Sequence, residues 1–326
     1  MGRARHVGRG GGVGADQREA FLEQAAHCEG RSPLYADLCR RFAEDPRVAA
    51  LADDWGDRVP LQILGGFHYL VLGGEARWDD VDAALDEHAD FLRRFVAEQP
   101  VQTNEVQRSW VLLPLFLHAI GSSDVHVVEL GASAGLNLAW DRYRYRYRGG
   151  EWGPADAPLV LSGDERRPLP DGLLSARPSV RSRIGIDLAP VDVTSAEGAR
   201  LLRAFVWAGH EERLARLDRA MEALRADPPE LLRGDVADAL PGVLERLPPD
   251  GVVLVFQTAV FHMLSEEGLA RVRETLDTSA RELVFVSAGR PRDLPRSWGM
   301  RIERPGGERT FVGHADYHGA WLDYQL

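Results

Sequence analysis

Apolar side chains recur every three or four positions over residues 16–120, which is the spacing that places them along one face of a helix. Pro33 and Pro46 stand where new helices are expected to begin, because proline fits the first turn of a helix. The last helix of this region is expected to open at Thr103 and to run to His118. The pattern therefore predicts an all-helical domain over residues 16–120.

Beyond residue 121 the pattern changes to short apolar runs rich in β-branched residues, separated by amphipathic stretches. The longest of these stretches, Leu201–Leu224, predicts one long helix with Arg and Glu on its outer face. The alternation predicts an α/β domain over residues 121–326 with a largely parallel sheet. The runs that predict its buried strands are 125–130, 183–188, 231–236, 251–257 and 282–287.

Arginine and tyrosine alternate strictly over residues 142–148, a spacing that places the tyrosines on one face of a strand and the arginines on the other. Gly149 and Gly150 are expected to turn the chain, and residues 158–161 to pair as the return strand. The pattern thus predicts a β-hairpin insertion near residues 142–161. Three roles stay open for it: a solvated hairpin with packed tyrosines, a cover over a ligand pocket, or a single-stranded nucleic-acid contact.

The most informative stretch is 124–141, in which a β-branched strand runs into a glycine turn and then a helix start. Gly131 and Gly135 enclose only small residues, so the backbone can approach a ligand closely. Free N–H groups at the helix start are expected to point into the gap, which suits a nucleotide-like ligand.

The segment Glu129-x-Gly131-x-x-x-Gly135-x-Asn137 resembles motif I of the class I S-adenosyl-L-methionine (SAM) dependent methyltransferases. More narrowly, the chain resembles the uncharacterised bacterial family DUF2332 over roughly residues 20–326. The segments that carry this resemblance are Thr103-Asn104-Glu105-Val106-x-Arg108, Glu129–Asn137, Asp141-Arg142-Tyr143, Asp187-x-x-Pro190-Val191-Asp192 and Gly234-Asp235. The resemblance implies a Rossmann-like methyltransferase sheet after the helical domain, with SAM as the cofactor.

Acids at the carboxyl ends of the second and third predicted strands are expected to hold the nucleoside. Asp187 stands where folds that bind adenosine place a ribose ligand, and the resemblance implies that Asp235 and the Val236 N–H recognise adenine. The expected cofactor-binding set is Glu129, Gly131, Ala132, Ser133, Gly135, Asn137, Asp187, Asp235, Val236 and Gln257.

Four residues are candidates for the reaction itself. His262 follows the strand that ends at Gln257 and is the first choice as general base, although a lone histidine is more often structural. Glu105 is the second choice. Asn104, Glu105 and Arg108 would share one face of a helix, either as a cap with a solvated ion pair or as groups offered to the substrate or the amino-acid end of SAM.

The same glycine turn also fits a rival pattern, because Gly131-Ala132-Ser133-Ala134-Gly135 satisfies the G-x-S-x-G nucleophile elbow of serine hydrolases. That fold needs sheet strands before the elbow to supply the oxyanion hole, and residues 1–120 are expected to be helical. A structural turn without a ligand is a third interpretation.

The composition excludes several classes of protein and makes some partners unexpected. The chain contains no lysine, which excludes Walker A phosphate loops, pyridoxal phosphate enzymes and protein kinases. The net charge of −11 makes nucleic acid an unexpected partner. Cys28 and Cys39 lack a CxxC spacing, so neither a zinc site nor a disulfide is expected. His314 and His318 would converge on a metal only on a helix, whereas a strand and turn are expected there, so no metal site is predicted.

Residues 1–15 read as a disordered leader, since they are rich in Arg and Gly without the apolar core of a secretory signal. No membrane span is expected, and the protein is expected in the cytoplasm. The sequence thus predicts a methyltransferase acting on a small-molecule acceptor. Alternatives are another SAM reaction that releases methylthioadenosine, or hydrolysis by Ser133. The acceptor and the oligomeric state stay unassigned.

Overall fold

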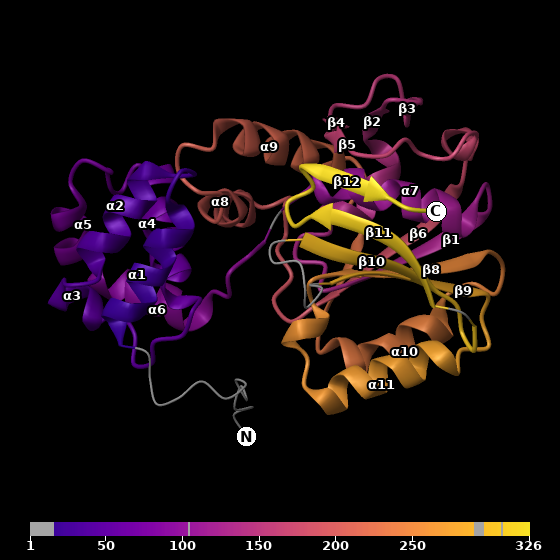
Figure 1. The fold of residues 1–326 in the computed structure, drawn as a ribbon. Helices are drawn as coiled ribbons and strands as arrows, with labels where there is room; N and C mark the ends of the chain where they lie inside the picture. Colours follow the sequence, from indigo (N-terminus) through magenta and orange to yellow (C-terminus); the bar gives the residue numbers. More distant parts are fainter. Residues whose placement is uncertain (1–15, 104, 290–296, 308) are drawn as a thin grey trace. The chain divides into compact units, whose positions relative to one another are not determined.

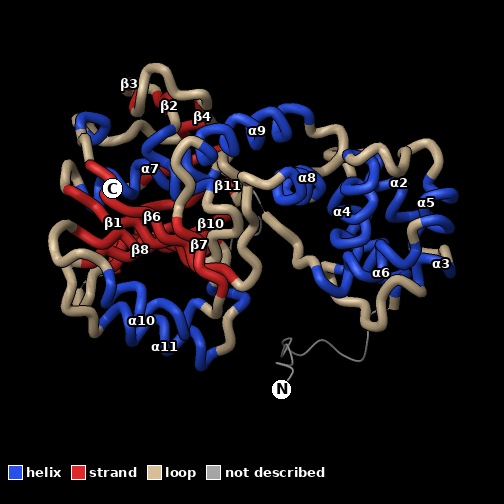
Figure 2. The backbone as a smooth tube through the Cα atoms, turned by 180° about the vertical axis from the view of Figure 1, so that it is seen from behind, coloured by secondary structure: helices blue, strands red, loops and turns tan. Residues whose placement is uncertain are grey.

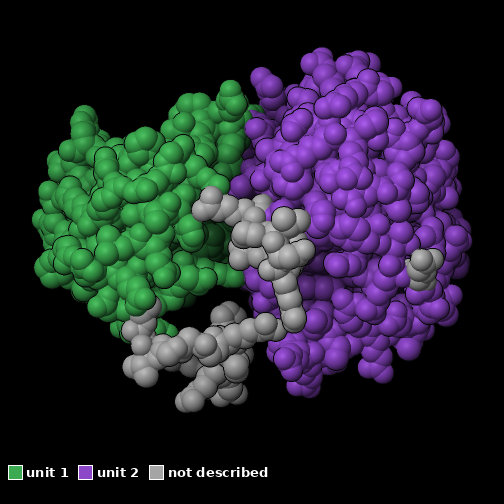
Figure 3. Space-filling model, viewed as in Figure 1, with its two compact units in different colours: residues 1–104, 194–215 green, residues 105–193, 216–326 purple. Residues whose placement is uncertain are grey.

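A computed structural model describes residues 16–103, 105–289, 297–307 and 309–326. It divides into two compact units, one formed by residues 1–104 and 194–215 and the other by residues 105–193 and 216–326 (Figure 3). No helix in the described part of the chain has the length and apolar character needed to cross a membrane.

The first unit is helical, as its amphipathic periodicity predicts (Figure 1). Asp16, Ser32, Asp45 and Asp80 accept hydrogen bonds from first-turn N–H groups and so fix where four of its helices begin. Its core contains the packed rings of Phe21, Phe42 and Phe67, among others. The helices are α1 (Gln17–Cys28), α2 (Pro33–Phe42), α3 (Pro46–Ala49), α4 (Val59–Leu72), α5 (Val81–Glu87), α6 (Ala89–Glu98) and α8 (Ala196–Ala204).

The single helix predicted over Leu201–Leu224 is in fact two helices. The chain leaves the helical conformation after α8 and resumes it in α9 (Glu211–Arg225). Gly209, with a φ of 86°, lies in the connection, and that left-handed conformation cannot continue a right-handed helix. The boundary between the two units falls within α9, so residues 194–215 belong to the helical unit although the sequence grouped them with the sheet.

The second unit is an α/β structure built on a nine-stranded sheet. Five strands at its centre are parallel, in the order β7-β6-β1-β8-β9, and β10, β11 and β12 continue the sheet as antiparallel neighbours. The strands are β1 (Asp124–Leu130), β5 (Asp164–Glu165), β6 (Ser179–Asp187), β7 (Glu230–Arg233), β8 (Val252–Thr258), β9 (Leu283–Gly289), β10 (Ser297–Glu303), β11 (Arg309–Asp316) and β12 (Trp321–Tyr324).

Helices cover both faces of this sheet, because its central strands are apolar on both sides. Helices α10 (Val236–Arg246) and α11 (Glu266–Asp277) pack on one face, and both views place them on the same side of the strands (Figures 1 and 2). On the other face lies α7 (Arg108–Ile120), whose Phe116 ring packs 5.1 Å from that of Phe256 in β8.

The Arg/Tyr repeat forms β2 (Arg144–Tyr147), and its partners differ from the prediction. The antiparallel return strand is β3 (Gly150–Trp152), while β4 (Val160–Ser162) pairs with β2 in parallel. Tyr145 and Tyr147 are buried, and their hydroxyls donate to the backbone carbonyls of Trp140 and Trp110. These contacts, and the ion pairs of Arg144 and Arg146 with Glu151, show that the hairpin packs on its own unit.

Candidate functional site

The carboxyl ends of the parallel strands bring the predicted site residues to one edge of the sheet. The chain runs from β1 to β6 and β7 on one side and then to β8 and β9 on the other, so strand order reverses between β1 and β8. In open α/β sheets ligands bind beyond the carboxyl ends at such a reversal. Glu129 of β1, Asp187 of β6 and Thr258 of β8 all lie at this edge, which we call the carboxyl edge.

Backbone strain marks the same place. Two non-glycine residues in the described part of the chain have a positive φ, Ser133 at 53° and Ala259 at 63°. One follows β1 and the other follows β8, the two strands that flank the reversal. Each such conformation costs about 1–3 kcal/mol and tends to occur at functional sites.

The glycine turn is tight, and three of its backbone amides bind carbonyls of the chain. Gly131 and Ala132 donate their N–H groups to the Ile186 carbonyl at 2.8 and 3.2 Å, and Gly135 donates to the Ala132 carbonyl at 2.7 Å. The helix that follows is a 3₁₀ helix of seven residues, η1 (Leu136–Arg142). These three amides stabilise the turn itself and are not available to a ligand.

Asp187 joins the glycine turn to the second strand. Its carboxylate accepts the Ser133 N–H at 2.7 Å and the Ala189 N–H at 2.8 Å. Asp235 lies at the end of the neighbouring strand and caps α10 by accepting the Ala237 N–H at 2.8 Å. Both acids thus have local structural roles at the carboxyl edge.

Glu129 is a buried acid, with 2% of its surface exposed. Burial is the main reason that its pKa lies well above the usual range, and the nearby Asp187 carboxylate adds to the rise. Asn137 hydrogen bonds to Glu129 and is itself held by Ser109, whose hydroxyl donates to the Asn137 side-chain oxygen at 2.8 Å. The second carboxyl oxygen of Glu129, Oε2, has no hydrogen-bond partner.

Arg108, the first residue of α7, is a buried cation beside this acid, with 3% of its surface exposed. It donates to the Thr258 hydroxyl and to the Tyr317 carbonyl, both at 3.3 Å. Its guanidinium carbon lies 4.7 Å from the centre of the Trp298 ring and 4.8 Å from that of Tyr317. Its Nη2 has no hydrogen-bond partner, and the cation is close enough to Glu129 to oppose the rise in the pKa of that carboxyl.

The segment before α7 holds the turn between β11 and β12. Gln107 donates its side-chain amide to the Gly319 carbonyl at 3.3 Å, and Glu105 lies near His318 of the same turn. Helix α7 begins at Arg108 rather than at Thr103, so Glu105 and Arg108 are not neighbours on a helix face as predicted. Glu105 instead pairs with Arg216 of α9 at 3.1 Å. Asn104 lies outside the described residues.

Three other predicted residues lie at the carboxyl edge in different settings. His262 is exposed on the short 3₁₀ helix η3 (Phe261–Met263) that follows β8. Gln257 is buried and holds the turn after β8, since its side chain accepts the Val260 N–H at 3.0 Å and donates to the Ala288 carbonyl at 3.1 Å. Val236 is buried at the start of α10.

Several residues of this site were not among those predicted from sequence. Arg216, Trp298, Tyr317 and His318 contribute an ion pair, two rings over Arg108 and a histidine near Glu105. The His314–His318 pattern was the one available signal for the last two, because it gathers histidine and tyrosine in a predicted turn. No group of three or more metal-binding side chains occurs among the described residues.

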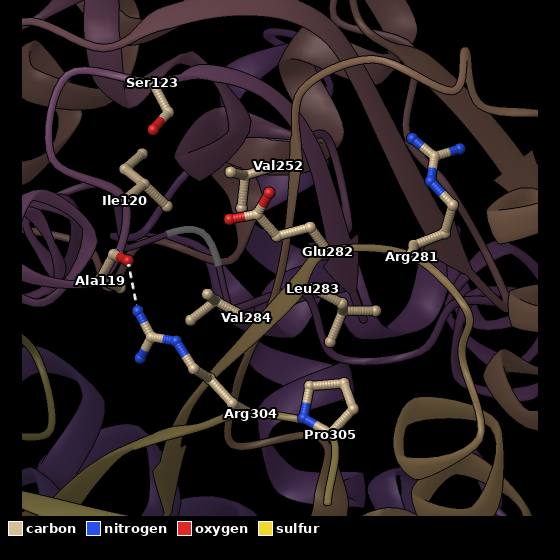
Figure 4. Close-up of a pocket in the computed structure, with 10 residues that line it drawn as sticks. All are labelled: Ala119, Ile120, Ser123, Val252, Arg281, Glu282, Leu283, Val284, Arg304 and Pro305. Atoms are coloured by element: carbon tan, nitrogen blue, oxygen red, sulfur yellow. Dashed lines mark hydrogen bonds between the residues drawn. The ribbon is translucent and has the colours of Figure 1, made fainter. Parts of the chain in front are cut away.

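A surface hollow of about 350 Å³ lies at the opposite edge, where β8 and β9 begin (Figure 4). It is lined by Arg281 and Arg304, among other residues. Arg304 donates to the Ala119 carbonyl at 2.9 Å, and Arg281 donates to the Leu247 carbonyl at 2.9 Å. Because both guanidinium groups bind backbone carbonyls and the parallel strands start here, we assign the functional site to the carboxyl edge and not to this hollow.

Comparison with known families agrees with the resemblance seen in the sequence. The family described as "Uncharacterized protein conserved in bacteria (DUF2332)" matches residues 18–324, so the chain belongs to that family. No curated protein matches the chain.

Proposed function

We propose that this DUF2332 protein is a SAM-dependent methyltransferase that acts on a small-molecule acceptor. The observation that carries the proposal concerns two of the buried side-chain atoms that lack a hydrogen-bond partner in the described part of the chain, Glu129 Oε2 and Arg108 Nη2, because they have opposite charge preferences and interact electrostatically. A buried unpaired polar group is costly, and a buried charge more so, unless a ligand completes it. An α-amino acid carries an ammonium that suits Glu129 and a carboxylate that suits Arg108, and SAM ends in such a group.

The nucleoside of the same ligand has candidate partners on the neighbouring strands. Asp187 keeps acceptor capacity for ribose hydroxyls, because a carboxylate offers about four lone-pair sites and two are used by N–H groups. Leu188 and Met263 are large apolar side chains with 57% and 52% of their surface exposed, and each belongs to a connection that leaves the carboxyl edge. In the proposed complex these side chains are candidates to contact the adenine ring. The SAM assignment therefore rests on side chains, not on the backbone amides of the glycine turn.

Methyl transfer from a sulfonium is a direct displacement, so the chain mainly has to position its ligands in line. Arg108 is fixed by two hydrogen bonds and two aromatic rings and thus offers one defined direction for a carboxylate. Glu129 is fixed through Asn137 and Ser109. Rigid groups of this kind hold a ligand without ordering cost at the time of binding.

Hydrolysis by Ser133 is less well supported. In the described part of the chain every element before β1 is a helix, so no earlier strand leads into an oxyanion loop. The Ser133 N–H is also bound to Asp187. A serine hydrolase would lose turnover of an activated ester in Ser133→Ala and would show no stabilisation by SAM.

Calorimetric titration of the full chain with SAM, S-adenosylhomocysteine and methylthioadenosine tests the proposal. We expect the first two to bind and methylthioadenosine, which lacks the amino-acid group, to bind at least tenfold more weakly. Equal affinity for methylthioadenosine would contradict the role of Glu129 and Arg108, and no response from a folded sample would overturn the cofactor. Release of methylthioadenosine instead of S-adenosylhomocysteine during turnover would indicate a different SAM reaction.

A further inference from the structure

Trp298 of β10 is fully buried, and its indole Nε1 has no hydrogen-bond partner in the described part of the chain. The chain itself completes two other buried indoles of the same unit. Trp110 Nε1 donates to the Arg146 carbonyl at 3.0 Å, and Trp152 Nε1 donates to the Ala176 carbonyl at 2.8 Å. A buried donor without an acceptor is costly, so the N–H of Trp298 needs an explanation that the fold alone does not give.

The Trp298 ring lies against the guanidinium of Arg108. The guanidinium carbon is 4.7 Å from the ring centre, and the Tyr317 ring meets the Trp298 ring edge-on, with centres 5.4 Å apart. In the sheet Trp298 is paired with Ala315 of β11, which holds its backbone in place. Two N–H donors without acceptors, Arg108 Nη2 and Trp298 Nε1, therefore belong to side chains in direct contact.

The chemistry of these two atoms defines what would satisfy them. Neither a guanidinium nor an indole can accept a hydrogen bond, so the two side chains cannot complete each other. Arg108 already uses Nη1 for the Thr258 hydroxyl and Nε for the Tyr317 carbonyl. A ligand that completes both donors has to bring acceptor atoms for two N–H groups and a negative charge for the buried cation. A carboxylate meets both requirements, since it has two oxygens and about four lone-pair sites.

We propose that the indole N–H of Trp298 is a second donor, beside Arg108, to the carboxylate of the bound ligand's α-amino acid group. This inference rests on the proposed binding of SAM. Arg108 supplies the charge, and Trp298 supplies a neutral donor whose direction is set by a packed ring. Trp298 is thereby a specificity-determining residue, which favours ligands that have the carboxylate over ligands that have only the ammonium.

The test compares Trp298→Phe with Trp140→Phe, which is its matched control. Trp140 is also fully buried with an unpaired Nε1, but its ring packs on those of Phe116 and Trp152. Each change keeps an aromatic ring and removes the N–H. The full-length proteins are titrated in a calorimeter with S-adenosylhomocysteine and with S-adenosylthiopropylamine, which is its decarboxylated analogue and keeps the ammonium.

We expect Trp298→Phe to bind S-adenosylhomocysteine about 10- to 100-fold more weakly than wild type, because it loses one hydrogen bond to a charged group. Its affinity for the decarboxylated analogue should stay within about threefold of wild type, since that ligand has no oxygen for the N–H. Trp140→Phe should bind both ligands within about threefold of wild type. Urea titrations establish first that both variants are folded.

NMR of the wild-type chain reads the same N–H without a substitution. In a ¹H–¹⁵N spectrum with assigned indole signals, we expect S-adenosylhomocysteine to shift the Trp298 signal downfield and to leave the Trp140 signal in place. The decarboxylated analogue should not produce that shift. This spectrum decides the question even if Trp298→Phe does not fold.

The outcomes separate this inference from the proposed function. A folded wild type that does not bind S-adenosylhomocysteine overturns both. Binding by wild type with an affinity of Trp298→Phe within threefold, or with no response of the Trp298 indole signal, overturns the inference alone. Equal weakening of S-adenosylhomocysteine and the decarboxylated analogue in Trp298→Phe also overturns it, because the substitution then acts on the packing of the site and not on the carboxylate.

Discussion

The two edges of the same sheet are built very differently. The amino edge, where the parallel strands begin, has the hollow. Two arginines that line it, Arg281 and Arg304, donate hydrogen bonds to backbone carbonyls. The carboxyl edge has two strained residues, Ser133 and Ala259, and buried polar atoms without hydrogen-bond partners on Glu129 and Arg108, among others. The hollow and the unpaired atoms of Glu129 and Arg108 therefore lie at opposite edges of the sheet.

The contrast indicates that unpaired buried groups are a better guide to a ligand site than a surface hollow is. A hollow lined by satisfied groups costs the protein little, because water solvates it as well as a ligand would. An unpaired buried charge destabilises the folded chain by several kcal/mol. An unpaired neutral polar group destabilises it by about 1–3 kcal/mol. Such groups are candidates for ligand contacts, and the predictions below ask whether the carboxyl edge behaves in this way.

The largest effect is expected from Arg108→Met, which removes the buried cation while keeping an unbranched side chain. Loss of one partner of a buried charged contact costs about 2–5 kcal/mol, or roughly 30-fold or more in affinity. We expect S-adenosylhomocysteine to bind Arg108→Met at least that much more weakly in calorimetry. Met also removes the two hydrogen bonds and the two ring contacts of Arg108, so a urea titration first establishes that the variant is folded.

Arg304→Met is the matched control at the amino edge. Arg304 lines the hollow and donates to the Ala119 carbonyl (Figure 4). We expect its affinity for S-adenosylhomocysteine to equal that of wild type. Weaker binding by Arg304→Met, with Arg108→Met unaffected, would reverse the assignment of the two edges.

Glu129→Gln is expected to weaken binding and to stabilise the fold. An ammonium needs an ionised partner, so a neutral amide at position 129 should lower affinity by about 1.5–3 kcal/mol. The folded chain gains because Gln removes a carboxyl group whose ionisation is disfavoured by burial and by Asp187. We expect an increase of about 0.5–2 kcal/mol in the free energy of unfolding at neutral pH, measured with urea.

The pH dependence of the stability difference between Glu129→Gln and wild type tests the direction of this pKa shift. The pKa of Glu129 is raised in the folded state, so the folded chain binds a proton that the unfolded chain has already lost. The wild type therefore loses stability as pH rises from the ordinary range of a glutamate towards the raised pKa, and Glu129→Gln lacks this loss. The stability advantage of the variant should grow from pH 4 to pH 7. A constant difference over that range would show that Glu129 is not perturbed as described.

The strands and acids of this edge could be predicted from sequence because their signals are local. A β-branched run followed by Gly131 predicts a strand and its end, and an acid directly after such a run, such as Asp187, must lie at the carboxyl edge of a parallel sheet. The family predicted from those segments is confirmed by a match over residues 18–324.

The partners of those residues could not be predicted, since they come from distant parts of the chain. Glu105 meets Arg216 and His318, which are 111 and 213 positions later, and nothing in the spacing of any one segment records this. The amides of the glycine turn illustrate a second limit. Whether the Gly131 N–H binds a ligand or the Ile186 carbonyl depends on how closely β6 approaches, which only tertiary structure decides.

A smaller effect, on stability, is expected from Gly131→Ala. Gly131 has a φ of 75°, and an added Cβ would lie 2.7 Å from Val260 Cγ2 in the connection after β8. The backbone strain and the forced movement of Val260 together should destabilise the chain by about 1–3 kcal/mol in urea unfolding. Gly242→Ala in α10, where an added Cβ meets no atom within 4 Å, is the control and should stabilise the chain by about 0.5–1 kcal/mol. Equal responses would remove the claim that the ends of β1 and β8 are closely fitted.

The smallest effect is expected where strain can be relieved without a clash. Ala259, with a φ of 63°, pays about 1–2 kcal/mol for the left-handed conformation, whereas glycine adopts it freely but loses about 0.5–1 kcal/mol more backbone entropy on folding. Ala259→Gly should therefore stabilise the chain by about 0.5 kcal/mol. The same change at Ala270, exposed within α11, should destabilise it by about 1 kcal/mol. Opposite signs for these two variants in parallel urea titrations would show that the carboxyl edge stores strain, and equal losses would show that it does not.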